Sequence, residues 1–330
     1  MARSRVISQN VAVFAGSSQI TRAQSANYSF ALNKEPVQVF GQLAPIDQIA
    51  LEPPTVTLDF SYLAVNSENE TVLGLDNGMT TILDGSQAEK HYAITISPQG
   101  QEASAADGAV GVGMGYITSY SAEGSIGAFP TASVTVEGSS MASNASGSTV
   151  QLLRVDENCA QSEVSAGGVP ASLPESATSV IRPGNVTVSI SGGNTGLQTE
   201  DICLQSYDIS VDMSRDPVQC LGCFWPVSRE LNFPITVTAT IEANLGDLGD
   251  ADMEGILCDD SLTTVTITLY ETDCSTPTLR GGQAVSYTLR GATLTGQNVS
   301  ASIGPNATVS ATYTAFVGGP DDNIHGFDIS

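Results

Sequence analysis

The chain has 330 residues and a mass of 34.1 kDa, enough for one large domain or two ordinary ones. It contains 35 acidic and 11 basic residues, which gives a formal net charge of −24. A chain this acidic cannot neutralise phosphates along a groove, which argues against a main role in binding nucleic acid or an anionic membrane surface. The apolar content of 41% argues against disorder.

The N-terminus carries two Arg but only one weak apolar run, Val11–Gly16, which follows the polar residues Gln9 and Asn10. This is not the pattern of a secretory signal, so we expect a cytoplasmic product with an intact N-terminus. No apolar run approaches the roughly 18 residues that a membrane-spanning helix needs. The two histidines, His91 and His325, leave little material for a metal centre or for His-based catalysis.

Alternation of apolar residues with Thr or Ser recurs along the chain, first at Thr55–Phe60 and later at Ile235–Ile241 and Thr264–Leu269. A period of two with β-branched residues predicts half-buried antiparallel strands. Helical patterns are short and occur at Glu68–Leu75 and, as a possible counterpart, at Asp250–Leu257. We therefore predict an all-β chain made of two similar antiparallel β-sandwich or barrel domains, each with a short flanking helix.

An internal duplication is the most informative feature of the sequence. Gln24–Leu58 aligns without gaps on Gln205–Ala239, with 12 identities in 35 positions. Composition alone would give about two or three identities over that length. Prolines and glycines match in register, which convergent strand composition would not reproduce. We predict one domain at residues 1–145, a second at 180–330, and a Ser/Gly/Pro-rich linker or surface arm at 146–179.

Cys220 and Cys223 have the spacing of a metal or redox motif, but no second pair of Cys or His with that spacing accompanies them. The first repeat has Val39 and Gln42 at these positions, so the fold does not require the cysteines. We interpret them as small buried hydrophobic residues, with a disulfide formed after release from the cell as the second interpretation.

Two other motifs favour structural interpretations. Acidic clusters at Asp247–Glu254, Asp259–Asp260 and Asp321–Asp322 match no calcium-binding loop, and we interpret them as solvated loop charge. The stretch Gly111–Gly115 lacks the helix that follows a nucleotide-binding glycine motif, so we expect a strand packed against another backbone. Trp225 replaces Ala44 of the first repeat and indicates a packing or interface difference between the halves. We find no set of nucleophile, base and orienting residue, and predict neither enzymatic activity nor a cofactor or metal site.

Two segments resemble bacteriophage tail tube proteins. Ile20–Leu63 contains "FGQLAPID" followed by the strand "PPTVTLDFSY", and Tyr116–Gly138 resembles the later strands of that family. The resemblance implies β-sandwich or barrel domains of tail-tube type whose sheets join those of neighbouring copies into one closed inner barrel. Rings of that family usually contain six such domains. Because each chain carries two, we expect three chains to form a pseudo-hexameric ring, and rings to stack into a tube.

The resemblance further implies a virion location in the tail, assembly in the cytoplasm of the host bacterium, and a lumen through which phage DNA passes without specific binding. Partners would be other copies and tail proteins such as a tape measure, a terminator, and a baseplate or hub protein. Three chains at −24 each bring −72 to a ring, which repels phosphates. The alternatives are a trimeric hub or distal tail protein and, from another class, a secreted calcium-dependent β adhesin.

Overall fold

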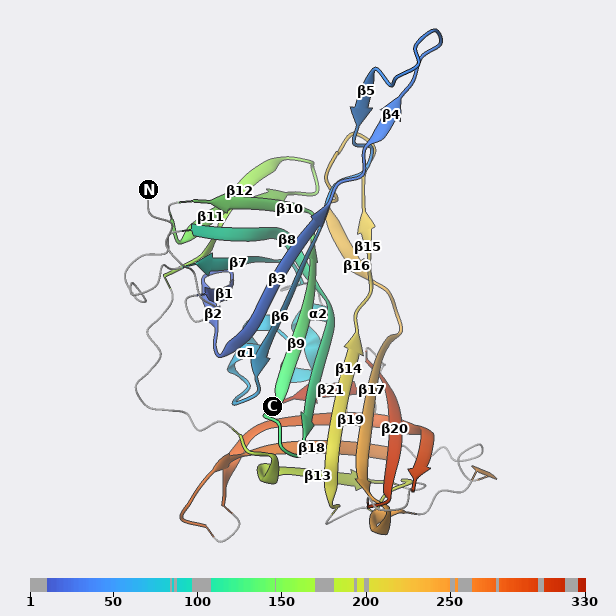
Figure 1. The fold of residues 1–330 in the computed structure, drawn as a ribbon. Coiled ribbons are helices and arrows are strands. Elements are labelled where there is room, and N and C mark those ends of the chain that lie inside the picture. Colours follow the sequence, from blue (N-terminus) through green and yellow to red (C-terminus); the bar gives the residue numbers. More distant parts are fainter. Residues whose placement is uncertain are drawn as a thin grey trace.

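The computed structural model describes residues 11–330 apart from 84, 86–87, 97–107, 146, 170–180, 193–194, 199–201, 250–252, 255–262, 277–278, 302–305 and 318–325. Nearly all regular structure in these residues is antiparallel β-strand, which confirms the all-β prediction. Figure 1 shows the first half of the chain above the second, with two hairpins projecting at the top right.

The elements of the first half follow one another in the order in which the sequence alternation and turn signals occur. They are β1 (Val11–Ala15), β2 (Ser18–Ile20), β3 (Ala23–Ala31), β4 (Glu35–Val37), β5 (Asp47–Ile49), β6 (Thr55–Leu63), α1 (Glu68–Leu73), α2 (Thr80–Leu83), β7 (Lys90–Ile96), β8 (Gly108–Ser125), β9 (Thr131–Gly138) and β10 (Ser140–Asn144).

An arm and the second half follow. The arm contains β11 (Thr149–Val155) and β12 (Gln161–Gly167), and the second half contains β13 (Val186–Ser191), β14 (Leu204–Asp212), β15 (Arg215–Val218), β16 (Ser228–Leu231), β17 (Ile235–Asn244), β18 (Thr263–Thr272), β19 (Arg280–Ser300), β20 (Thr308–Val317) and β21 (Gly326–Ile329). The predicted helix at Glu68–Leu75 is α1. Its possible counterpart at Asp250–Leu257 lies outside the described residues except for Met253 and Glu254, which are helical.

Strand order is the same in the two halves. The first half pairs β3-β6-β9-β8, and the second pairs β14-β17-β20-β19. Each half also has a side sheet, β1-β7-β8-β10 in the first and β13-β18-β19-β21 in the second. The long strands β8 and β19 belong to both sheets of their half, so each half closes around its own apolar interior.

Register repeats as well as order. The pair Ser25↔Ser61 between β3 and β6 recurs as Ser206↔Glu242 between β14 and β17, 181 residues later in both strands. Irregularities in the pairing recur at equivalent places too, within β3 and β14, within β7 and β18, and within β8 and β19. A β-bulge shifts which side chains face the core, so its repetition in both halves is a specific similarity.

The two four-stranded sheets join through β8 and β14 into one antiparallel sheet with the order β3-β6-β9-β8-β14-β17-β20-β19. We refer to these eight strands as the long sheet. One face of it is apolar and buried, and its residues belong to a single hydrophobic core that includes both halves and α1. The two halves therefore share one interior across the β8–β14 pairing, which we call the internal junction.

The segment 146–179 contains more regular structure than its composition indicates. Strands β11 and β12 form a hairpin, the arm hairpin, whose Val150 and Leu152 pack with Phe14 on the side sheet of the first half. A Cβ atom on Gly111 would lie 2.5 Å from Val150 Cγ2, so only glycine allows this approach. The stretch Gly111–Gly115 is a strand packed closely under another strand, as predicted.

A buried carboxyl group connects the two halves below the internal junction. Glu70 of α1 accepts hydrogen bonds at Oε1 from the hydroxyl groups of Tyr62, at 2.8 Å, and Tyr120, at 3.2 Å. Tyr120 also donates to the hydroxyl of Tyr287 in the second half, at 3.3 Å. Burial raises the pKa of Glu70 above its ordinary range, although both tyrosine hydroxyls favour its ionised form.

Because the folded state holds the proton of Glu70 more tightly than the unfolded state does, stability should fall as pH rises. The loss begins above about pH 4.3, the ordinary value for Glu, and is complete above the raised pKa. We predict that Glu70→Gln removes this part of the pH dependence of the urea unfolding free energy. The exposed Glu68→Gln on the same helix is the control, and an unchanged slope in Glu70→Gln would contradict the assignment.

Candidate assembly surfaces

The second face of the long sheet is polar and carries no positive charge. Its strands, with β19 counted from Ala292, contain no Lys or Arg, and the side chains on this face are mostly Ser, Thr and Asn. The carboxylates on it are Asp59, Glu123, Glu137, Asp208, Asp212 and Glu242. Such a surface is hydrated and repels polyanions over short distances.

The internal junction shows what a covered edge of this sheet looks like. Ile209 and Val211 of β14 are 0% and 1% exposed against β8, and Ala122 of β8 is 1% exposed. On the polar face Asp208 lies directly opposite Glu123. Burial and, second, the charge of Glu123 raise the pKa of Asp208. Like charges in direct opposition destabilise a strand pair, so the apolar face has to offset them.

The long sheet ends in two unpaired edges whose apolar side chains are exposed. On β3, Tyr28 and Phe30 are 44% and 60% exposed, although their equivalents in the second repeat are the buried Ile209 and Val211. On β19, Val299 is 48% exposed, and its equivalent is the buried Ala122. The edges have the composition of a covered junction but lack a partner strand in the single chain.

Two hairpins extend the long sheet at one end, which we call the hairpin end (Figure 1). The first hairpin includes β4 and β5, and the second includes β15 and β16. Their tips share a glycine with positive φ, Gly41 at 89° and Gly222 at 103°, which explains why both repeats keep glycine there. At the first tip, Phe40 and Leu43 are fully exposed.

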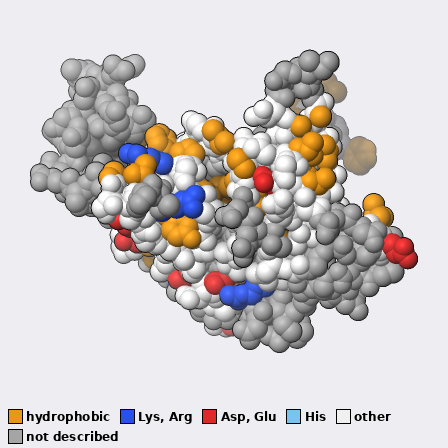
Figure 2. Space-filling model, turned by 90° about the horizontal axis from the view of Figure 1, so that it is seen from below, with side chains coloured by type: hydrophobic (Ala, Val, Ile, Leu, Met, Phe, Trp, Pro, Cys, Tyr) orange, Lys and Arg blue, Asp and Glu red, His pale blue; other side chains and the backbone are white. Residues whose placement is uncertain are grey.

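The opposite end of the long sheet, the turn end, carries the β8–β9 turn. There Ile126 and Phe129 are 64% and 57% exposed, and the equivalent of Phe129 in the second repeat is the exposed Asn306. Seen from below in Figure 2, the described side chains form scattered hydrophobic patches among uncharged polar groups, with few charges. Both ends of the sheet in the first half therefore present apolar side chains.

The second hairpin is fixed to the first half by two arginines. The Arg215 guanidinium lies 5.2 Å from the ring centre of Tyr116 and donates from Nε to the carbonyl of Ile117. Arg229 Nη1 donates to Glu137 Oε1 at 2.7 Å. Because both arginines are buried, these contacts hold the hairpin stem more firmly than exposed ion pairs would.

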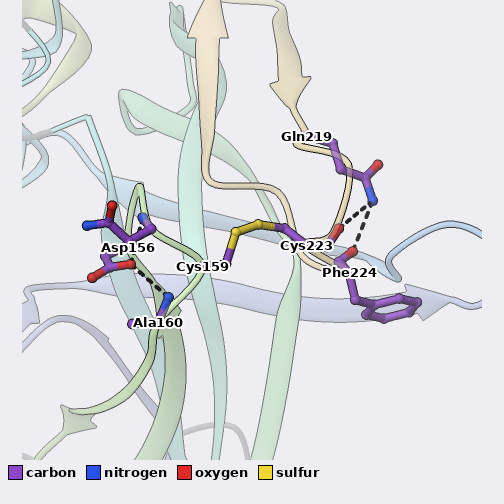
Figure 3. The surroundings of a disulfide bond; sticks show 7 residues. Asp156, Cys159, Ala160, Gln219, Cys223 and Phe224 are labelled. Carbon is purple, nitrogen blue, oxygen red and sulfur yellow. Dashed lines mark hydrogen bonds between the residues drawn. A yellow bond between two sulfur atoms is a disulfide. The ribbon is translucent and has the colours of Figure 1, made fainter.

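Cys223 is neither a metal ligand nor a simple buried hydrophobic residue. It is buried and forms a disulfide with Cys159 at the turn of the arm hairpin, as Figure 3 shows, whereas Cys220 is exposed. The preferred sequence interpretation of this pair was therefore wrong, and the second interpretation, a disulfide, applies to Cys223. Sequence reasoning missed Cys159 because it lies 64 residues away in a segment without a strong strand pattern. Trp225 lies in the same loop and packs edge-on against Phe224.

Among the described residues, no group of three or more His, Cys, Asp and Glu could hold a metal ion. Of the acidic clusters only Asp247, Glu254 and the exposed flanks are described, and Asp247 accepts a hydrogen bond from the backbone of Cys203. No helix in the described part is long and apolar enough to cross a membrane. The largest groove, about 770 Å³ between the arm hairpin and the second hairpin, has no His or Cys among its described lining residues.

Comparisons with known proteins give structural likenesses only. No protein-family model and no curated protein matches the chain. The structure is similar to the tube-terminating cap of the anti-feeding prophage, with 10% identity, a TM-score of 0.34, and coverage of 44% of this chain and 95% of that one.

It is also similar to an Hcp protein, with 11% identity, a TM-score of 0.25, and coverage of 44% of this chain and 97% of that one. For the SPP1 tail tube the identity is 10%, the TM-score is 0.19, and the coverage is 52% and 74%. TM-scores of this size do not establish a common fold, so the function of this chain has to be inferred from its own geometry.

The like-charge pair at the internal junction gives a direct test of the electrostatic description. Glu123→Gln removes one charge and keeps the oxygen that accepts a hydrogen bond from Thr131. We predict a stability gain of about 0.2–1 kcal/mol at neutral pH and a fall in the pKa of Asp208. Unfolding free energies and NMR titration of Asp208 measure both effects. Glu163→Gln, at an exposed site on the arm hairpin, is the control, and an equal gain there would contradict the account.

Proposed function

We propose that this chain is a non-enzymatic structural subunit of a phage-type tail tube, three copies of which form a ring. The observation that carries the proposal is the pairing of β8 with β14 inside one chain. Because β8 is equivalent to β19, and β14 to β3, the internal junction is a template for a contact between β19 of one copy and β3 of the next.

The template fixes the register of that contact, which we call the closing junction. Applying the repeat offsets to the internal pairs places Tyr28 opposite Val299 and Asn27 opposite Ser300. The pairing would bury the exposed apolar edge residues and satisfy the unpaired backbone groups of both strands. Repeated head to tail, it joins the long sheets of successive copies, and a closed ring leaves no free edge.

The closing junction is better suited to association than the internal one. Asn27 and Ser300 stand where the internal junction has the repelling pair Asp208 and Glu123. The internal junction is maintained by the covalent chain between its halves, so it tolerates that repulsion. Two separate molecules lack the tether, and an uncharged pair at the same place lowers the cost of bringing them together.

The polar face supports a role as a conduit. In a ring closed by these junctions, the apolar face is already covered by the side sheets and α1, which leaves the polar face for the inside. A lumen lined by Ser, Thr and carboxylates would let DNA pass without holding it. The number of three chains comes from the resemblance to a family with six domains per ring. We place the protein in the virion tail, assembled in the host cytoplasm with other tail proteins.

The closing junction is tested by giving it the charges of the internal one. We predict that Asn27→Asp with Ser300→Glu weakens each contact by roughly 0.2–1 kcal/mol, so that ring formation requires a several-fold higher protein concentration. Asn27→Asp with Ser300→Lys, which places opposite charges together, should restore assembly. Analytical ultracentrifugation measures the association, and circular dichroism checks the fold of each variant.

Equal assembly by the two double variants would contradict the predicted register. Trimers that form but never stack at any concentration would favour a hub or distal tail protein instead. Monomers at all concentrations, with a thermal midpoint that depends on Ca²⁺, would favour the adhesin.

A further inference from the structure

The two hairpins have matching sequences but different surroundings. Leu221 occupies the position equivalent to Phe40, and both are fully exposed at the tips. The second hairpin is bound to its own chain by the Cys159–Cys223 disulfide, which joins it to the turn of the arm hairpin (Figure 3). An arm follows only the first repeat, and the first repeat has Gln42 in place of Cys223, so the first hairpin has no equivalent bond.

Both loops that carry the disulfide are shaped by hydrogen bonds of their own. In the arm turn, Asp156 Oδ1 accepts from the backbone N–H groups of Asn158 and Ala160, at 2.9 and 2.8 Å. In the second hairpin, the side chain of Gln219 donates to the carbonyl groups of Cys223 and Phe224. Local bonds therefore position the two sulfur atoms, and the disulfide adds a permanent connection between prepared loops.

The stem of the second hairpin is committed to its own chain in the same way. Arg215 and Arg229 contact the ends of β8 and β9 through buried, partly ionic bonds. At the equivalent positions the first hairpin has Lys34 and Gln48, and the strands that it would meet in the next copy have Thr314 in place of Glu137. The first hairpin thus lacks both the ionic contact and the covalent bond.

The first hairpin has a possible partner surface at the other end of the same sheet. Its tip presents Phe40 and Leu43, and the turn end of the first half presents Ile126 and Phe129. One apolar surface at each end of a molecule permits a head-to-tail contact between copies stacked along the sheet direction. In the second half, Asn306 replaces Phe129, so the apolar turn, like the free hairpin, occurs once per chain.

We propose that only the first hairpin of each chain docks onto a second copy in the neighbouring ring, with Phe40 and Leu43 against the Ile126–Phe129 turn. The disulfide and the two arginines reserve the second hairpin for its own chain. A ring of three chains then makes three hairpin contacts with the next ring, although it contains six hairpins. This inference rests on the proposed ring, and it assigns the residues and the symmetry of stacking.

Matched pairs of variants separate the two kinds of hairpin and turn. Phe40→Asp and Phe129→Asp should reduce the mean number of rings per stack at least tenfold. Leu221→Asp and Asn306→Asp, at the equivalent positions of the other repeat, should stack like the parent protein. Negative-stain electron microscopy measures stack length, and the mass of disassembled rings shows whether the rings themselves are intact.

The outcomes distinguish this inference from the proposed function. Rings that stack equally well in all four variants, or that stop stacking in Leu221→Asp as well as in Phe40→Asp, would overturn the threefold docking and leave the ring in place. A parent protein that forms no rings would overturn both.

The part played by the disulfide can be measured on the unassembled chain. Amide hydrogen exchange in residues 219–226 should be at least tenfold slower than in residues 38–45, and Cys159→Ser should remove most of that difference. Cys203→Ser, at an exposed cysteine without a disulfide, is the control. Equal exchange in the two hairpins of the parent protein would contradict the inference that one of them is committed to its own chain.

Discussion

The unpaired edges of the long sheet are the constraint on which the rest of the structure depends. Strand β3 at one edge and the end of β19 at the other expose backbone groups together with Tyr28, Phe30 and Val299. An antiparallel sheet with such edges is a template for further pairing. The same chain already covers one edge of this kind, at the internal junction, and the duplication makes the two remaining edges complementary to each other.

The duplication creates similarity of shape and then permits differences of chemistry. Within the chain, the junction carries opposed carboxylates, Asp208 and Glu123, and is supported by Arg215, Arg229 and the arm hairpin. At the free edges the charged pair is absent and larger apolar side chains take its place. A junction that is tied by the chain can serve the polar face, whereas a junction between separate molecules has to associate without help.

The local patterns of the sequence predicted much of this fold. Alternation predicted β6, β17 and β18, and the ungapped alignment of the repeats predicted the equivalence that the strand registers confirm. The glycine stretch at Gly111–Gly115 was interpreted correctly as a close-packed strand. Each of these features depends on neighbours within one strand or on a comparison between two segments, which a single sequence contains.

Features that depend on distant contacts were beyond a single sequence. The arm hairpin has no long alternating pattern, and its packing on Phe14 is possible only because glycines lie opposite it. The partner of Cys223 lies in that arm and could not be chosen among the other cysteines. The buried Glu70 sits on a short helix whose pattern gives no sign that three tyrosines from two halves surround it.

End-on electron microscopy of the purified protein, with symmetry averaged from single rings, tests the central claim most directly. The account predicts hollow rings with threefold symmetry and six similar lobes, because each of three chains contributes two equivalent domains through one internal and one closing junction. Rings with sixfold symmetry built from six whole chains, or open chains of subunits that never close, would contradict it.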